Sequence, residues 1–123
     1  MPHRVASWLK DIRSRILRVQ AKIEGLTLAD YEGDLDLREI CERNLSVIGE
    51  GATQLRNNHI EWASRIRDVN RICNFRNVLV HESFKVNDAE VWLSLQERLI
   101  PLLHDIEGLL DESSDPDHRP ETE

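Results

Sequence analysis

The segment that decides the fold reads VASWLKDIRSRILRVQAKI and runs from Val5 to Ile23. Its apolar residues recur at spacings of three and four, so a helix of 3.6 residues per turn places them along one face. That face comprises Val5, Trp8, Leu9, Ile12, Ile16, Val19 and Ile23. We therefore predict an amphipathic helix that ends near Gly25 and turns this face toward a hydrophobic core.

The rest of the chain predicts three further long helices. Their expected bounds are about Asp34–Arg56, Glu61–Val80 and Asn87–Leu110. The 123 residues include only five glycines and four prolines, which favours an all-α, up-and-down bundle of four main helices within residues 1–110. Residues 111–123 contain no apolar side chain and several acids, so we expect an acidic, disordered tail.

Local signals refine these helices. Thr27 and Asp30 have the spacing of a capping box, which predicts one short turn in the linker 26–33, and Asn87 marks the start of the last helix. Pro101 cannot donate a backbone hydrogen bond and should kink that helix. Gly49 and Gly51, in the second helix, indicate close contact with another helix or the close approach of another group.

Several classes of protein are disfavoured by composition. The two cysteines, Cys41 and Cys73, lack CxxC spacing, so we expect small buried residues rather than a disulfide or a metal site. The spacing of His59, His81 and His104 also fits no metal-ligand pattern. We find no apolar run long enough for a membrane span and no signal-peptide core at the N-terminus. We therefore expect a cytoplasmic protein without a metal or cofactor.

The net charge of −7 is unevenly distributed. Residues 105–123 hold eight acids and one base, whereas the preceding residues are neutral, and the segment 65–76 has four arginines against one acid. Arg65, Arg67 and Arg71 are therefore candidates for binding the phosphates of RNA, with a solvated helix face as the alternative. We also considered that the acidic tail, residues 111–123, competes with RNA for these arginines or helps to choose a partner, with a solvated tail of no function as the alternative.

A second candidate site lies in RNVLVH, residues 76–81. Arginine stabilises a phosphate that gains charge in its transition state, and histidine exchanges protons near neutral pH. Two groups of this kind can cleave RNA without a metal, so Arg76 and His81 are candidate catalytic residues. The alternative is a structural histidine at a helix end, with Arg76 in an ordinary ion pair with Glu50 or Glu82.

The chain resembles the HepT-like branch of the HEPN superfamily over roughly residues 6–107. The similar blocks, in the family's order, are WLKDI (8–12), RNLSVIGEGA (43–52), NFRNVLVH (74–81), VNDAEVW (86–92) and LIPLL (99–103). The resemblance implies a helical bundle that forms a homodimer, with an interfacial cleft that cuts single-stranded RNA. It also implies a toxin whose partner is an MNT-type minimal nucleotidyltransferase antitoxin.

By this resemblance Arg76 and His81 are catalytic, and Asn77 is the polar residue beside the arginine. Many members carry a tyrosine two residues after the histidine, which receives AMP from the partner. Here Ser83 stands at that position as the candidate modification site, and the only tyrosine is Tyr31.

Helix geometry also favours a dimer. Five residues at about 100° each place Arg76 and His81 roughly 140° apart around the helix. The two side chains of one chain therefore point to different sides and do not readily form one site. Two subunits would supply two imidazoles, one to take the proton of the ribose 2′-hydroxyl and one to protonate the leaving 5′-oxygen. The products would carry 2′,3′-cyclic phosphate. The alternatives are a non-catalytic module that docks a nucleotidyltransferase and is modified by it, and a purely structural subunit.

Overall fold

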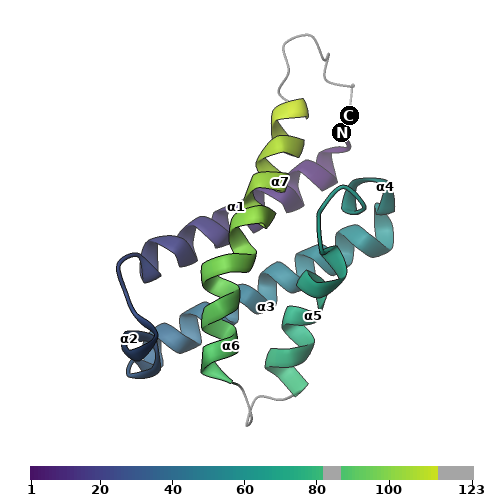
Figure 1. Cartoon of the computed structure of the whole chain (residues 1–123). Helices are drawn as coiled ribbons and strands as arrows, with labels where there is room; N and C mark the ends of the chain where they lie inside the picture. Colours follow the sequence, from purple (N-terminus) through teal and green to yellow (C-terminus); the bar gives the residue numbers. More distant parts are fainter. Residues whose placement is uncertain (82–86, 114–123) are drawn as a thin grey trace.

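The computed structural model describes residues 1–81 and 87–113, apart from the side chains of residues 76–78, 80, 81 and 113. Within this part of the chain every regular element is helical, which confirms the all-α prediction (Figure 1). The four expected helices correspond to α1 (His3–Ile23), α3 (Leu35–Asn58), α5 (Val69–His81) and a composite of α6 (Asp88–Leu93), η2 (Ser94–Arg98) and α7 (Leu99–Ser113). Two short helices, α2 (Leu28–Glu32) and α4 (Ile60–Ala63), lie between them.

The helices α1 and α3 pack side by side and run in opposite directions (Figure 1). All predicted inner residues of α1 are buried except Trp8, which is half-buried and lies edge-on against His59 with ring centroids 5.8 Å apart. A Cβ on Gly51 would lie 3.1 Å from Cδ1 and Cγ1 of Ile12. The predicted close contact at Gly51 is therefore confirmed, and it is the contact between α3 and α1.

The connection between these helices follows its local sequence. Gly25 ends α1 with a φ of 77°, a left-handed conformation that glycine adopts without steric cost. Thr27 and Asp30 then form the predicted capping box: the Thr27 N–H donates to the Asp30 carboxylate and the Asp30 N–H to the Thr27 hydroxyl. The short helix α2 is thus fixed by its own cap.

The third predicted helix, Glu61–Val80, is interrupted, and this part of the prediction was wrong. The chain leaves the helical path after α4, and Asp68 has a φ of 56° before α5 begins. The backbone N–H of Arg67 donates to the carboxylate of Asp105 in α7 at 3.0 Å instead of to a helical carbonyl. A contact with a distant helix therefore splits what the local pattern describes as one helix.

The last helix begins at the predicted cap, where the Asn87 carboxamide oxygen accepts from the N–H groups of Ala89 and Glu90. Pro101 provides no N–H for the carbonyl of Glu97, and the turn just before it, η2, is π-helical. The helix continues to Ser113, three residues beyond the expected end at Leu110.

Buried apolar side chains from α1, α3, α5 and α7 form the core, together with both cysteines, which are free. In α7 the core residues are Leu99, Leu102, Ile106, Leu109 and Leu110. No helix in the described residues is both long and apolar enough to cross a bilayer.

Candidate functional site

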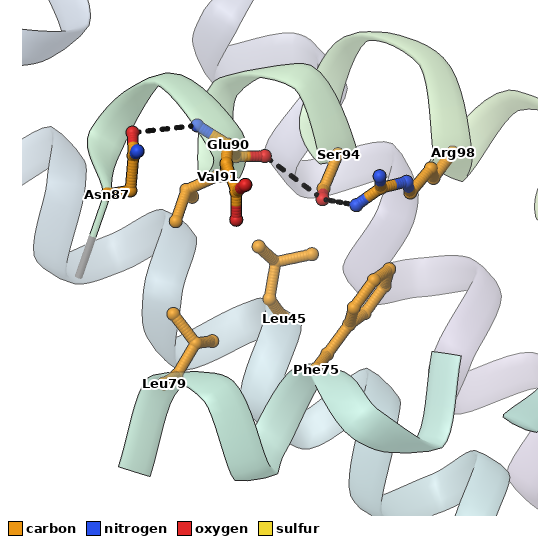
Figure 2. A pocket seen from close by; sticks show the side chains of 8 residues that line it. All are labelled: Leu45, Phe75, Leu79, Asn87, Glu90, Val91, Ser94 and Arg98. Carbon is orange, nitrogen blue, oxygen red and sulfur yellow. Dashed lines mark hydrogen bonds between the residues drawn. The ribbon is translucent and has the colours of Figure 1, made fainter. Parts of the chain in front are cut away.

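Helix α5 carries the predicted catalytic motif. Arg76, Asn77 and His81 belong to its second half, although their side chains fall outside the described part of the structure, and Ser83 lies wholly outside it. On the same helix the side chains of Phe75 and Leu79 are buried. Helix α5, and with it the backbone of the motif, packs against α3, and Phe75 and Leu79 lie on the side of α5 that faces α3 and α6 (Figure 2).

A pocket lies between α5 and the last helix (Figure 2). Figure 2 shows Phe75 and Leu79 facing Leu45 of α3 and Val91 of α6 across this space. Its volume of about 80 Å³ is small against the 300–1,000 Å³ typical of ligand sites. We therefore read it as a packing gap under the motif rather than as the place where a nucleotide binds.

The upper edge of this pocket is a chain of polar contacts. Nη1 of Arg98 donates to the Ser94 hydroxyl at 2.8 Å, and that hydroxyl donates to the Glu90 carbonyl at 3.2 Å (Figure 2). Arg98 was not among the residues that the sequence singled out. Its spacing of four from Ser94 and its position just before Leu99 and Pro101 are the only sequence signals for it.

Two of the three predicted RNA-binding arginines are paired within the chain. The guanidinium of Arg65 forms an ion pair with Glu112 of α7 and lies over the Trp62 ring at 5.6 Å. The guanidinium of Arg67 binds both carboxylate oxygens of Asp105 at 3.1–3.2 Å. Both acids belong to α7, and only Glu112 lies within the predicted tail of residues 111–123. Any RNA phosphate would have to compete with these carboxylates for the two cations.

Arg71 is exposed and forms no ion pair or hydrogen bond with the described residues. It lines a groove of about 350 Å³ between the start of α5 and the last helix, together with Arg67 and Arg98. Of the three predicted arginines, Arg67 and Arg71 thus line one groove and Arg65 does not. Arg98, which was not predicted, lines the same groove.

The contact with Arg67 affects the pKa of Asp105. Partial burial disfavours the charged form of Asp105, but hydrogen bonds from the Arg67 side chain and backbone, and the charge of Arg67, outweigh it. The pKa of Asp105 is consequently below its ordinary value. Asp105 therefore stays ionised, and bound to Arg67, throughout the neutral range.

Tyr31 does not provide an accessible hydroxyl. Its side chain is fully buried, lies 5.3 Å from the Trp92 ring between centroids, and its hydroxyl has no hydrogen-bond partner among the described residues. Burial raises the pKa of Tyr31 well above that of a free tyrosine. A modifying enzyme would reach this hydroxyl only if α2 left the core.

Comparison with protein families identifies the family to which the matched residues are similar. A protein-family model described as "Ribonuclease HepT-like" matches residues 12–109. The matched range includes α3, α5 and the motif positions Arg76 and His81. Searches of curated proteins and of solved structures found no significant match.

Proposed function

Because the chain belongs to the HepT-like ribonuclease family, we propose that it is a metal-independent endoribonuclease that cleaves single-stranded RNA in the cytoplasm. Arg76 and His81 perform the reaction at the interface of a homodimer, with Asn77 as a polar aid. The single observation that carries this proposal is the family match over residues 12–109, because it includes the whole helix that bears Arg-x₄-His.

In the proposed reaction, one imidazole accepts the proton of the ribose 2′-hydroxyl, and the resulting oxygen attacks the adjacent phosphorus. The second imidazole, from the other subunit, protonates the 5′-oxygen as its bond to phosphorus breaks. The Arg76 guanidinium groups stabilise the extra negative charge on the phosphate in the transition state. One product strand ends in 2′,3′-cyclic phosphate and the other begins with a 5′-hydroxyl.

The position of α5 supports this arrangement. Phe75 and Leu79 anchor the helix on the core, so the motif backbone is held on a packed element rather than on a loop. Rigid support of this kind is what a catalytic pair requires, since small displacements of reacting groups reduce rates strongly.

The test is cleavage of labelled single-stranded RNA in the presence of EDTA. The wild-type protein should produce fragments with 2′,3′-cyclic phosphate, and both Arg76→Ala and His81→Ala should lower the rate at least about 100-fold. Matched controls are Arg13→Ala and His3→Ala, which remove the same residue types from α1 and should cleave normally. Intact RNA after incubation with a folded wild-type dimer would contradict the proposal.

We further propose that the chain is the toxin of a toxin–antitoxin pair whose antitoxin is an MNT-type nucleotidyltransferase, with Ser83 as the site of modification. Tyr31 is excluded from that role by its burial. Mass spectrometry after incubation with the partner and ATP should find AMP on Ser83 and none on Tyr31. Co-purification of the two chains tests the pairing itself.

A non-catalytic binding module is the second candidate. It is favoured by the ion pairs of Arg65 and Arg67 with α7, because they neutralise two cations that an RNA substrate would otherwise use. A folded protein that binds the nucleotidyltransferase and is modified by it, yet leaves RNA intact, would establish this alternative.

A further inference from the structure

The groove between α1 and α3 gathers positive charge from two helices. It has a volume of about 600 Å³, and its charged lining residues are Arg15, Arg18 and Lys22 of α1 and Asp36, Glu39 and Arg43 of α3. On each helix these residues are three or four positions apart, so they share one face. Four cations therefore line the groove against two carboxylates, in a chain whose net charge is −7.

Most of this positive charge is available to a ligand. Arg18, Lys22 and Arg43 are exposed and form no ion pair or hydrogen bond with the described residues. The arginines before α5 differ in this respect, because Arg65 and Arg67 are bound to carboxylates of α7. An anion would meet less competition in the α1–α3 groove than at the arginines that the sequence favoured.

The fourth cation, Arg15, is held in place by a buried amide. Asn44 is only 3% exposed, and its oxygen accepts from Nη1 of Arg15 at 3.3 Å while its nitrogen donates to the Ile40 carbonyl at 2.8 Å. Nε of Arg15 also lies 3.9 Å from the Asp11 carboxylate. Burying an amide is costly unless it is hydrogen-bonded, so Asn44 on the inner side of α3 positions a cation rather than filling the core.

We propose that the α1–α3 groove binds the phosphate backbone of single-stranded nucleic acid. This RNA-binding site is separate from the proposed catalytic helix, α5. The choice of RNA as natural ligand rests on the proposed function. Guanidinium groups match phosphate oxygens in a two-pronged geometry. Among the described residues, no aromatic side chain lines the groove for stacking bases, and Ile40 is the only apolar residue in its lining. Contacts are therefore with phosphates and independent of base sequence, which disfavours an apolar peptide as ligand.

The experiment measures fluorescence anisotropy of labelled single-stranded DNA and of 2′-O-methylated RNA, since neither has the 2′-hydroxyl that the proposed cleavage needs. Arg18→Gln/Lys22→Gln is compared with Lys10→Gln/Arg13→Gln, which removes one arginine and one lysine from the same helix. At about 100° per residue, Lys10 and Arg13 lie on the other flank of the buried face of α1. Circular dichroism verifies that both variants fold.

Each phosphate contact on a single strand adds about 0.7 to the slope of log affinity against log salt. The groove variant should therefore bind both probes roughly 25-fold more weakly near 0.1 M salt, with a slope lower by about 1.4. Adding Arg43→Gln should weaken binding by roughly a further fivefold. The control variant should stay within about twofold of wild type.

Unchanged affinity in the groove variant, or an equal loss in the control variant, overturns the inference. Competition by polyglutamate as strong as that of single-stranded DNA would assign the groove to acidic protein segments and overturn it as well. Cleavage of unmodified RNA is measured on the same preparations. If the wild-type protein does not cleave RNA, the proposed ribonuclease function is contradicted. The groove inference still holds in that case if binding of the two probes depends on Arg18 and Lys22.

Discussion

Arg67 and Asp105 tie the break before α5 to helix α7. The Arg67 guanidinium binds both oxygens of the carboxylate at 3.1–3.2 Å, and its backbone N–H donates to one of them at 3.0 Å. Since α5 begins at Val69, only two residues later, the start of the motif helix is anchored through this carboxylate.

Asp105→Asn should lower the thermal midpoint at neutral pH by a few degrees, because it removes the charge that Arg67 binds. The folded-state pKa of Asp105 is below its ordinary value, so its contribution is complete above the ordinary value of 3.8 and is lost as the pH falls through the lower folded value. Thermal unfolding from pH 7 to pH 3 should therefore show wild type and variant converging only at the acidic end. Asp36→Asn, on the exposed surface of α3, is the control. Equal thermal midpoints of wild type and Asp105→Asn at neutral pH would show that the Asp105 charge does not stabilise the fold.

Gly51 of α3 and Gly108 of α7 should respond oppositely to alanine. A Cβ on Gly108 meets nothing within 4 Å, so Gly108→Ala should raise the free energy of unfolding by about 1 kcal/mol through helix propensity. A Cβ on Gly51 lies 3.1 Å from Ile12, a buried side chain, so Gly51→Ala should lower the free energy by about 1 kcal/mol. Urea denaturation measures both. An equal rise in the free energy of unfolding of both variants would show that α1 and α3 move apart easily to accept the added methyl group.

Asn87→Ala should lower the free energy of unfolding by about 1 kcal/mol, because the N–H groups of Ala89 and Glu90 lose their acceptor at the start of α6. Asn87→Asp keeps that acceptor and should be close to wild type. Chemical denaturation of the three proteins in parallel is the measurement. A loss of equal size in both variants would mean that Asn87 acts through another contact.

Tyr31→Phe should raise the free energy of unfolding by about 1 kcal/mol. The hydroxyl is buried without a hydrogen-bond partner in the described part of the chain, so removing it relieves a desolvation cost. The phenylalanine ring keeps the contact with Trp92. Denaturation in urea tests this, and destabilisation would reveal a partner for the hydroxyl.

Periodicity and local capping were sufficient to predict much of the fold. The buried face of α1, the capping box at Thr27 and the cap at Asn87 depend on residues within a few turns of each other. Such short-range rules are visible in any single sequence. The Gly51 contact was also predictable, because a helical glycine in an apolar face needs a reason such as close packing.

The break at Asp68 and the ion pairs of the arginines were not predictable in the same way. No glycine or proline marks the break, and the carboxylate that accepts from the Arg67 N–H there belongs to Asp105, 38 residues away in the sequence. The arginine cluster was identified because several arginines lie close together in the sequence. Whether such an arginine is available to a ligand depends on ion pairs with distant residues, such as that of Arg65 with Glu112. The α1–α3 groove was missed because its cations are distributed over two helices and stand out only when their faces are compared.

The π-helical turn η2 corrects the phase of the last helix. Val91, Leu95 and Leu99 are buried at two successive spacings of four, and each such step would drift about 40° around an α-helix. A turn with more residues per revolution cancels part of that drift, so side chains before and after η2 reach the same interior. Deleting one residue within η2 would restore regular winding but rotate either α6 away from Tyr31 or α7 away from α1.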